Sequence, residues 1–286
     1  FYAIFYESFN KCNCSLLRWF LSTMKSFKIR ASQLSKIMTK PKDSGGITDT
    51  QQEFLNDMDE RDKPMTEKQQ EKYDYLLEKK HKPEGLSEGA KTYCKEWLKH
   101  KLLGREPEIA SKYLDKGIIA ESGAIQLLNK LYQEDYTKNT ERLSNEFMTG
   151  ECDIHKNRII RDTKCSWSVK SFPMLAVDVC YEYYWQNQAY LILWDAEYGW
   201  VDYCLVNTPD RIIEQESKRI SWRDNRDYIE VLEEQEKKHK YDDLEVWKRV
   251  KSFPVERHDV EERINQKVIL CREHIETLIK ENRINV

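Results

Sequence analysis

The stretch that decides the fold spans residues 151–165 and reads ECDIHKNRIIRDTKC. It contains two short runs, Glu151–His155 and Arg158–Cys165, separated by a turn. Short runs of β-forming residues on either side of a turn are typical of adjacent antiparallel strands. Such a hairpin brings Asp153 on one strand close to Asp162 on the next.

The segments around this hairpin alternate between helical and strand patterns. Upstream, the spacing predicts a helix over Lys116–Tyr132 and a first strand over Arg142–Met148. Downstream, it predicts a helix over Tyr181–Tyr198 and a further strand over Trp200–Val206. The order helix, three strands, helix, strand predicts an α/β fold with a mixed central sheet flanked by helices.

The rest of the chain is expected to add helices at both ends of this core. A capping box opens a predicted helix over Thr66–Lys80, and a glycine ends a second one over Ser87–Leu103. The acid-rich residues 43–63 are expected to form a loop or a solvated insertion. From Ile212 onward the pattern is charged and helical, closing with a helix over Val260–Glu281.

The first residues of the chain differ in composition from the rest. Residues 1–23 combine seven aromatic side chains with interrupting charges, and they have no signal-peptide pattern. Met24 opens a polar, basic stretch. We therefore expect residues 1–23 to be a non-native or disordered leader, with an aromatic oligomerisation tail as the alternative. No clean linker interrupts the remainder, so residues 24–286 are expected to form one domain.

Composition excludes several classes of protein. The 286 residues carry 47 Lys+Arg against 50 Asp+Glu, a net charge of −3, and 40% are hydrophobic. No window approaches the roughly 20 apolar residues of a membrane span, which predicts a soluble protein. The eight cysteines form no CxxC pair, which argues against a zinc ribbon or a clustered iron–sulfur site. Scattered thiols predict a reducing, cytoplasmic location.

Three acids and a lysine fall where they can form a hydrolytic site. Asp162 and Lys164 are two apart and share one face of their strand. Glu121 leaves its helix on the apolar face, where a bound cation would remove the cost of an unpaired carboxylate. With Asp153 and the carbonyl of Thr163, these oxygens suit Mg²⁺ or Mn²⁺. Lys164 would then orient or deprotonate the attacking water.

Each of these residues also has a structural alternative. Glu121 at the edge of its helix face can reach water without any metal. The hairpin can be an exposed element in which Asp162 and Lys164 form a surface ion pair. An Asp-x-Lys pattern alone is weak, whereas the ordered set on helix, strand and strand is more specific.

Four segments carry a resemblance to a known family: KGIIAESGAIQLL, MTGECDI, RIIRDTKCSWSVKSFP and YYWQNQAYLILW. They resemble the phage-type exonucleases of the PD-(D/E)XK superfamily, the lambda exonuclease and YqaJ-like viral recombinase group. The resemblance runs from about Lys25 to the C-terminus. It implies a restriction-endonuclease-like αβββαβ core. It also implies Mg²⁺-dependent hydrolysis of DNA phosphodiester bonds from duplex ends, 5′ to 3′, in phage recombination or replication.

The resemblance assigns roles to the acid–lysine set. Glu121 matches the helix acid of the family and Asp153 its central metal-binding aspartate. Asp162 fills the position of the second acid, and Lys164 is the motif lysine. The proline of the superfamily name is replaced by Cys152, a departure that leaves the ligands intact.

Candidate DNA contacts come from three patterns. Gln186 and Tyr190 match the Q-x-x-x-Y pattern of the RecB-like branch, on the helix after the third core strand; a plain polar helix position is the alternative for Gln186. Basic residues including Arg161 surround the proposed metal site. Arg30 and Ser32 lie at a predicted helix start in the region that binds the 5′-phosphate in the resembled family. The alternative is a simple N-cap by Ser32.

Together these observations favour a metal-dependent exonuclease acting on double-stranded DNA ends. The alternatives are a RecB-like structure-specific or helicase-associated nuclease, or an inactive module that binds DNA ends. An intact acid–lysine set disfavours the inactive module. The resemblance further implies a homo-oligomer, a trimeric ring, with a single-strand annealing recombinase as candidate partner and the host cytoplasm as location if a phage encodes the protein.

Overall fold

The computed structural model describes residues 27–41, 49–61, 63–81, 85–105 and 112–282. The predicted leader, residues 1–23, lies outside this part of the chain. The described residues form two compact units: the first lies within Phe1–Phe27, Lys36–Arg105 and Glu262–Val286, and the second within Lys28–Ser35 and Glu106–Glu261. Within the described ranges, no helix combines the length and apolarity needed to cross a bilayer.

The first unit is helical. Its helices are α3 (Asp49–Asp59), α4 (Glu67–His81), α5 (Glu88–Leu103) and most of α10 (Glu261–Glu281). The predicted capping box forms, with the Thr66 amide donating to Gln69 Oε1 at 3.0 Å. Ser87 also caps α5, its Oγ accepting from the Ala90 amide at 3.1 Å. Short helix α2 (Leu34–Met38) begins in the second unit and ends in the first.

The expectation of a loop over residues 43–63 is wrong for its central part, which forms α3. The acid-rich composition hides an amphipathic spacing. Leu55 is buried, Lys72 of α4 lies over the Phe54 ring at 3.9 Å, and the two helices pack together. Burial of this narrow apolar stripe stabilises a helix that composition alone does not reveal.

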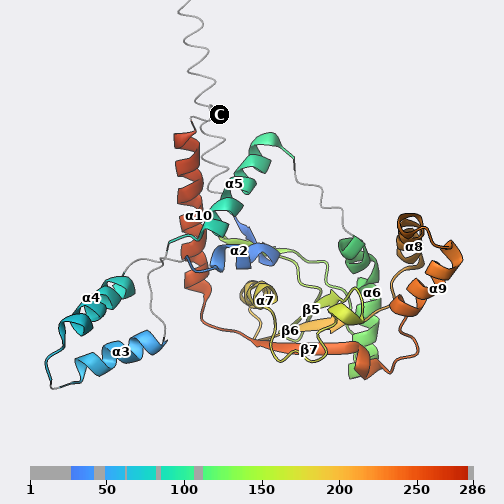
Figure 1. Ribbon diagram of the computed structural model, residues 1–286, viewed down its shortest axis with the longest axis horizontal. Coiled ribbons are helices and arrows are strands. Elements are labelled where there is room, and N and C mark those ends of the chain that lie inside the picture. Colours follow the sequence, from blue (N-terminus) through green and yellow to red (C-terminus); the bar gives the residue numbers. More distant parts are fainter. Residues whose placement is uncertain (1–26, 42–48, 62, 82–84, 106–111, 283–286) are drawn as a thin grey trace, which may run out of the picture. The chain divides into compact units, whose positions relative to one another are not determined.

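The second unit is built around a mixed four-stranded sheet (Figure 1). The strands are β4 (Ile154–Lys156), β5 (Ile159–Cys165), β6 (Tyr198–Cys204) and β7 (Val250–Glu256), in that spatial order. β5 and β6 are parallel, and the two outer pairs are antiparallel. Helices α6 (Lys112–Tyr132) and α7 (Tyr181–Leu193) both pack against this sheet.

The prediction of one strand over Arg142–Met148 is wrong, because a tight turn divides it. β2 (Leu143–Ser144) and β3 (Met148–Gly150) are antiparallel, and the Asn145 side chain accepts from the Met148 amide at 2.8 Å to close the turn. β3 also pairs in parallel with β1 (Ile29–Arg30), which completes a separate three-stranded sheet. The α/β class and the mixed sheet are confirmed, whereas the specific αβββαβ order is not.

The helical expectation from Ile212 onward is wrong for residues 250–256, which form edge strand β7. Phe253 and Val255 alternate with exposed neighbours and are each only 3% exposed, the period of a half-buried strand. Pro254 between them lies on an edge strand, where a missing amide is tolerated. Two helices precede it, α8 (Asp210–Asp224) and α9 (Tyr228–His239), as the charged pattern predicts.

Candidate active site

The two aspartates of the hairpin meet as the sequence predicts. Asp153 immediately precedes β4, and its Oδ2 accepts from the Thr163 amide at 2.6 Å and from Thr163 Oγ1 at 2.8 Å. Thr163 therefore fixes the Asp153 carboxylate against β5. The predicted coordination of a metal by the Thr163 carbonyl stays a prediction, since the contacts of Thr163 to Asp153 use its amide and hydroxyl.

Asp162 and Lys164 form the ionic centre of the site. Asp162 is only 2% exposed, and its Oδ2 lies 2.6 Å from Lys164 Nζ. Burial raises the pKa of Asp162 well above that of an ordinary carboxyl; the Lys164 ammonium opposes this rise and the Asp153 charge adds to it. Burial disfavours the charged form of Lys164, but the Asp162 and Asp153 carboxylates outweigh it and raise the pKa of Lys164.

Helix α7 holds this pair through Gln186. The Gln186 amide accepts from Lys164 Nζ at 3.3 Å and donates to Asp162 Oδ1 at 3.4 Å and to the Tyr190 hydroxyl at 2.8 Å. Gln186 and Tyr190 are both buried. The Q-x-x-x-Y pattern therefore places both residues at the site, one helical turn apart, as the sequence indicates. Their polar contacts fix the position of the lysine.

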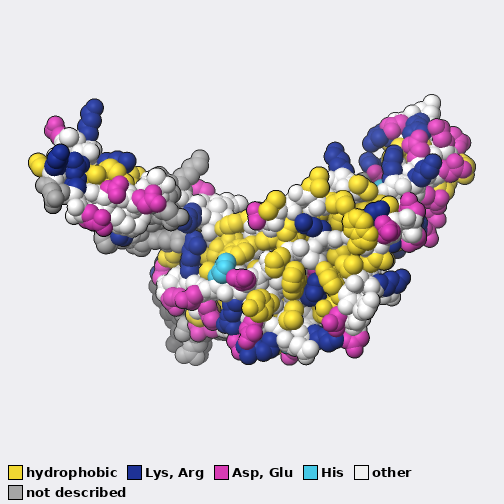
Figure 2. All heavy atoms as spheres, turned by 90° about the horizontal axis from the view of Figure 1, so that it is seen from below, with side chains coloured by type: hydrophobic (Ala, Val, Ile, Leu, Met, Phe, Trp, Pro, Cys, Tyr) yellow, Lys and Arg dark blue, Asp and Glu magenta, His cyan; other side chains and the backbone are white. Residues whose placement is uncertain are grey.

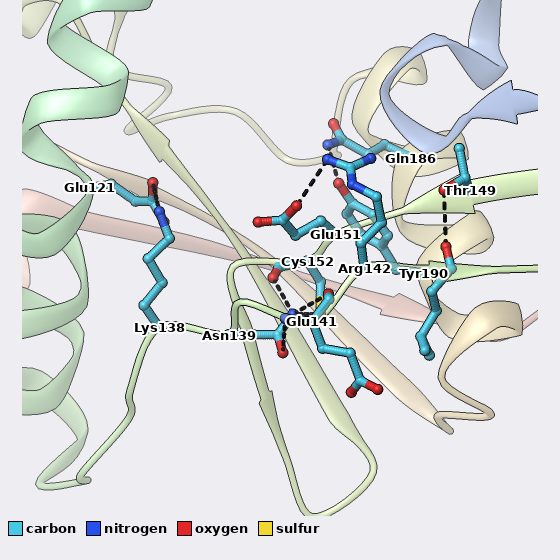
Figure 3. A network of polar contacts seen from close by, with 11 residues as sticks. Glu121, Lys138, Asn139, Glu141, Arg142, Thr149, Glu151, Cys152, Gln186 and Tyr190 are labelled. Atoms are coloured by element: carbon cyan, nitrogen blue, oxygen red, sulfur yellow. Dashed lines mark hydrogen bonds and ion pairs between the residues drawn. The ribbon is translucent and has the colours of Figure 1, made fainter.

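Glu121 enters from α6, where Lys138 neutralises it. Lys138 Nζ lies 2.8 Å from Glu121 Oε2, while Oε1 is buried without a hydrogen-bond partner among the described residues. Figure 3 shows Lys138 reaching Glu121 from the segment that Asn139 ties down. The backbone N–H of Asn139 donates to the Asp153 carbonyl at 2.7 Å. The Asn139 side-chain amide donates to the Cys152 carbonyl at 3.0 Å.

The carboxylates share one electrostatic environment. The pKa of Lys138 is raised, chiefly by its hydrogen bond to Glu121, and the negative charges of Glu121 and Asp153 add to the rise. Asp153 also acts on Asp162. Yet in the described part of the chain no three His, Cys, Asp or Glu side chains stand at metal-binding spacing. The orphaned Glu121 Oε1 and the Asp153 carboxylate are oxygen donors of the kind that a hard divalent cation takes, but a metal held by Glu121, Asp153 and Asp162 together stays a prediction.

Arg161 lies away from this site, although the sequence groups it with the DNA contacts. It is adjacent to Asp162 and points to the opposite face of β5. Its Nε and Nη2 donate to the Asp202 carboxylate at 2.7 and 2.8 Å, and only 6% of the residue is exposed. We assign Arg161 a structural role, because its guanidinium is enclosed in this ion pair.

Arg30 and Ser32 are exposed in the segment that links β1 to α2. Arg30 takes the N-cap position of the 3₁₀ turn Ala31–Gln33 without a side-chain cap, and Ser32 lies inside that turn. The N-cap alternative for Ser32 is therefore wrong. The turn packs on α7: a Cβ at Gly150 would lie 2.9 Å from the Tyr190 ring and 3.1 Å from Ala31 Cβ, so a glycine is needed there.

Two residues of the site escape sequence analysis. Lys138 stands in an irregular segment with no periodicity. Tyr183 lies on α7, and Lys164 Nζ lies 4.5 Å from the centre of its ring, a cation–π contact. Tyr183 precedes Gln186 by three residues, so the helical spacing of α7 is the signal that identifies it.

Comparisons with known proteins point to exonucleases. No protein-family model and no curated protein matches the chain. A phage-related exonuclease from Haemophilus somnus 129PT is similar in structure, with 25% identity and a TM-score of 0.62 over 89% of this chain and 96% of that one. An alkaline exonuclease from Laribacter hongkongensis shares the fold, with 13% identity and a TM-score of 0.50 over 93% and 95%. The resemblance to phage-type exonucleases that the sequence indicates is confirmed by these structural neighbours.

Proposed function

We propose that the protein is a metal-dependent DNA exonuclease that hydrolyses phosphodiester bonds from duplex ends, 5′ to 3′, in phage recombination or replication. One observation carries the proposal: Thr163 holds the Asp153 carboxylate beside the Asp162–Lys164 pair of strand β5, in a chain that is similar to a phage-related exonuclease. The similarity supports a nuclease. Metal dependence and polarity rest on the site residues and the resemblance.

The acidic residues and Lys164 have different roles in the proposed reaction. Mg²⁺, or Mn²⁺ in its place, would supply Lewis-acid stabilisation of the phosphate and a more acidic bound water. Glu121, Asp153 and Asp162 provide the oxygen donors for such an ion. Lys164 Nζ, held by Asp162 and Gln186, directs its positive charge into the site, where it can orient the nucleophile or neutralise a phosphate oxygen.

The end of the DNA would be bound beside the catalytic residues. Arg30 and Ser32 are exposed on the 3₁₀ turn that packs against α7, the helix of Gln186 and Tyr190. A guanidinium and a hydroxyl suit a terminal 5′-phosphate. A homo-oligomeric ring around DNA and an annealing recombinase as partner extend the same proposal, and light scattering at micromolar concentration tests the ring.

A single digestion experiment tests the chemistry and the polarity. Linear duplex labelled on either the 5′ or the 3′ strand end is incubated with the protein in Mg²⁺, and covalently closed circular DNA serves as the control. We expect early release of the 5′ label as mononucleotide, late release of the 3′ label, an intact circle and no reaction in EDTA. Digestion in EDTA would contradict the metal dependence, and early release of only the 3′ label would contradict the polarity.

A further inference from the structure

A pocket of about 500 Å³ lies beside the end of the catalytic strand. One wall is the segment that follows β5, from Trp167 to Lys170. The other is the C-terminal end of α9 and the loop after it, from Lys237 to Leu244. Both walls belong to the second unit. None of the residues assigned to the active site above lines this pocket.

The lining of the pocket is strongly basic. It carries four lysines, Lys170, Lys237, Lys238 and Lys240, against one acid, Asp243. The whole chain has a net charge of −3, and the face seen in Figure 2 intersperses basic and acidic side chains. A local excess of positive charge in a concave site focuses the field on an incoming anion.

Two of these lysines remain available to a ligand. Lys240 pairs with Asp210, and Lys238 Nζ lies 3.6 Å from Glu234. Lys170 and Lys237 are exposed, and neither forms an ion pair with a carboxylate in the described part of the chain. Their charges therefore face the pocket without an internal counter-ion.

The pocket wall is built from buried polar contacts. His239 is 5% exposed, its Nδ1 lies 3.2 Å from the Trp167 carbonyl, and the two rings meet edge to face at 5.0 Å. The buried Lys116 donates to the carbonyls of Ser166 and Trp167 at 2.8 and 3.1 Å. These contacts hold the Trp167 ring in place at the pocket, where an aromatic face suits a nucleobase.

The pocket lies close to the scissile phosphate of the proposed reaction. Trp167 follows Lys164 by three residues, so the two Cα atoms are at most about 11 Å apart. We infer that this pocket binds the phosphodiester backbone of the nucleic-acid strand next to the bond being cleaved, through Lys170 and Lys237, with Trp167 against a base. The inference rests on the proposed nuclease function, but it concerns binding rather than hydrolysis.

The salt dependence of DNA binding tests this inference. Lys170→Gln, Lys237→Gln and the double variant are titrated against a fluorescent 20-nucleotide strand in EDTA over a range of salt concentrations. For a single strand, each lost phosphate contact lowers the slope of log K against log salt by about 0.7. We expect the double variant to lose about 1.4 from the slope, and the matched control Lys218→Gln, an exposed lysine of α8 outside the pocket, to lose nothing.

A second readout separates this inference from the proposed function. Cleavage of a dinucleotide in Mg²⁺ reaches only the catalytic residues, so the double variant should cleave it at the wild-type rate. If the wild type releases no mononucleotide from linear duplex in Mg²⁺, the proposed function fails, while the salt slopes still decide the pocket. Salt slopes of the double variant equal to those of the Lys218→Gln control would overturn the inference. That result would overturn it even if the pocket were found to bind an acidic peptide such as polyglutamate.

Discussion

The two faces of strand β5 carry two buried ion pairs that differ in how completely they are satisfied. On one face, Arg161 and Asp202 form a two-pronged pair, and Ser252 Oγ donates to Asp202 Oδ1 at 2.5 Å. On the other face, Asp162 and Lys164 form a single short contact beside further negative charge. Neighbouring positions of one strand thus face two different electrostatic environments.

The difference separates a structural pair from a chemical one. The Arg161 guanidinium also lies over the rings of Tyr132 and Trp200, at 4.6 and 5.2 Å, so it is enclosed by aromatic side chains as well as by its ion pair. Beside the Asp162–Lys164 pair, Asp153 adds negative charge, and Glu121 Oε1 of helix α6 is buried without a hydrogen-bond partner among the described residues. Excess carboxylate charge is costly in a protein interior unless a cation offsets it. This contrast supports the proposal that a metal binds beside Asp153 and Asp162.

The largest expected effect is the loss of cleavage in Asp153→Asn. The amide oxygen of asparagine still accepts from Thr163, so the local structure persists, but a metal-binding charge is removed. We expect the cleavage rate to fall by roughly three orders of magnitude or more, about 4 kcal/mol of transition-state stabilisation. Metal-free DNA binding, measured by fluorescence anisotropy, should persist. Near wild-type digestion would remove Asp153 from the site.

On the closed face, we expect Arg161→Met to lower the stability of the fold rather than to remove a catalytic group. It leaves the Asp202 carboxylate buried without its partner, which typically costs about 3–5 kcal/mol. Urea denaturation followed by circular dichroism measures the loss. Arg161→Lys, which keeps the charge but not the two-pronged contact, should lose less. Wild-type stability in Arg161→Met would mean that the closed face is not structural.

A third buried charge, Lys116 near the end of β5, extends the comparison, because it donates to two backbone carbonyls and lies near two aromatic rings but pairs with no carboxylate among the described residues. Burial lowers the pKa of Lys116 to about 8, whereas an unfolded lysine keeps its ordinary, higher value. Between these pKa values the unfolded chain binds more protons, so the free energy of unfolding rises with pH, by up to about 3 kcal/mol. Urea unfolding from pH 7.5 to 9.5 measures this rise. Lys116→Met should flatten it, and an unchanged slope would contradict the assignment.

The smallest expected effect concerns Lys138, the internal counter-ion of Glu121. Lys138→Met removes a positive charge that competes with a metal, so Mn²⁺ should bind about tenfold more tightly, roughly 1.4 kcal/mol. Isothermal titration calorimetry measures the affinity. Lys156→Met is the control, because Lys156 pairs with Glu134 and Asp135 instead. Weaker or unchanged Mn²⁺ binding in Lys138→Met would show that Lys138 does not compete.

Local patterns predict the parts of this molecule that local chemistry determines. The hairpin of β4 and β5, and with it the approach of Asp153 to Asp162, is predictable from two short runs and a turn. The helical spacing on α7 brings Gln186 and Tyr190 to the same side. Caps such as that of Ser87 form between residues three apart, within the reach of sequence reasoning.

Contacts between distant residues escape such patterns. Arg161 pairs with Asp202, 41 positions away, so a basic residue beside the site is in fact enclosed. Lys138 meets Glu121 across 17 positions from a segment without periodicity. Strand β7 alternates weakly within a charged stretch, and its pairing with β6 rather than its composition makes it a strand. Tertiary context decides each of these cases.

The most direct test of the central claim is a measurement of bound Mn²⁺ by electron paramagnetic resonance, without DNA, on variants of the two faces of β5. The account predicts saturable binding in the wild type, its loss in Asp153→Asn beside the Asp162–Lys164 pair, and its retention in Ser252→Ala, which removes contacts to Asp202 and Tyr132 on the closed face. Full Mn²⁺ binding by Asp153→Asn, or its loss in a folded Ser252→Ala protein, would contradict the assignment of the metal site to the open face.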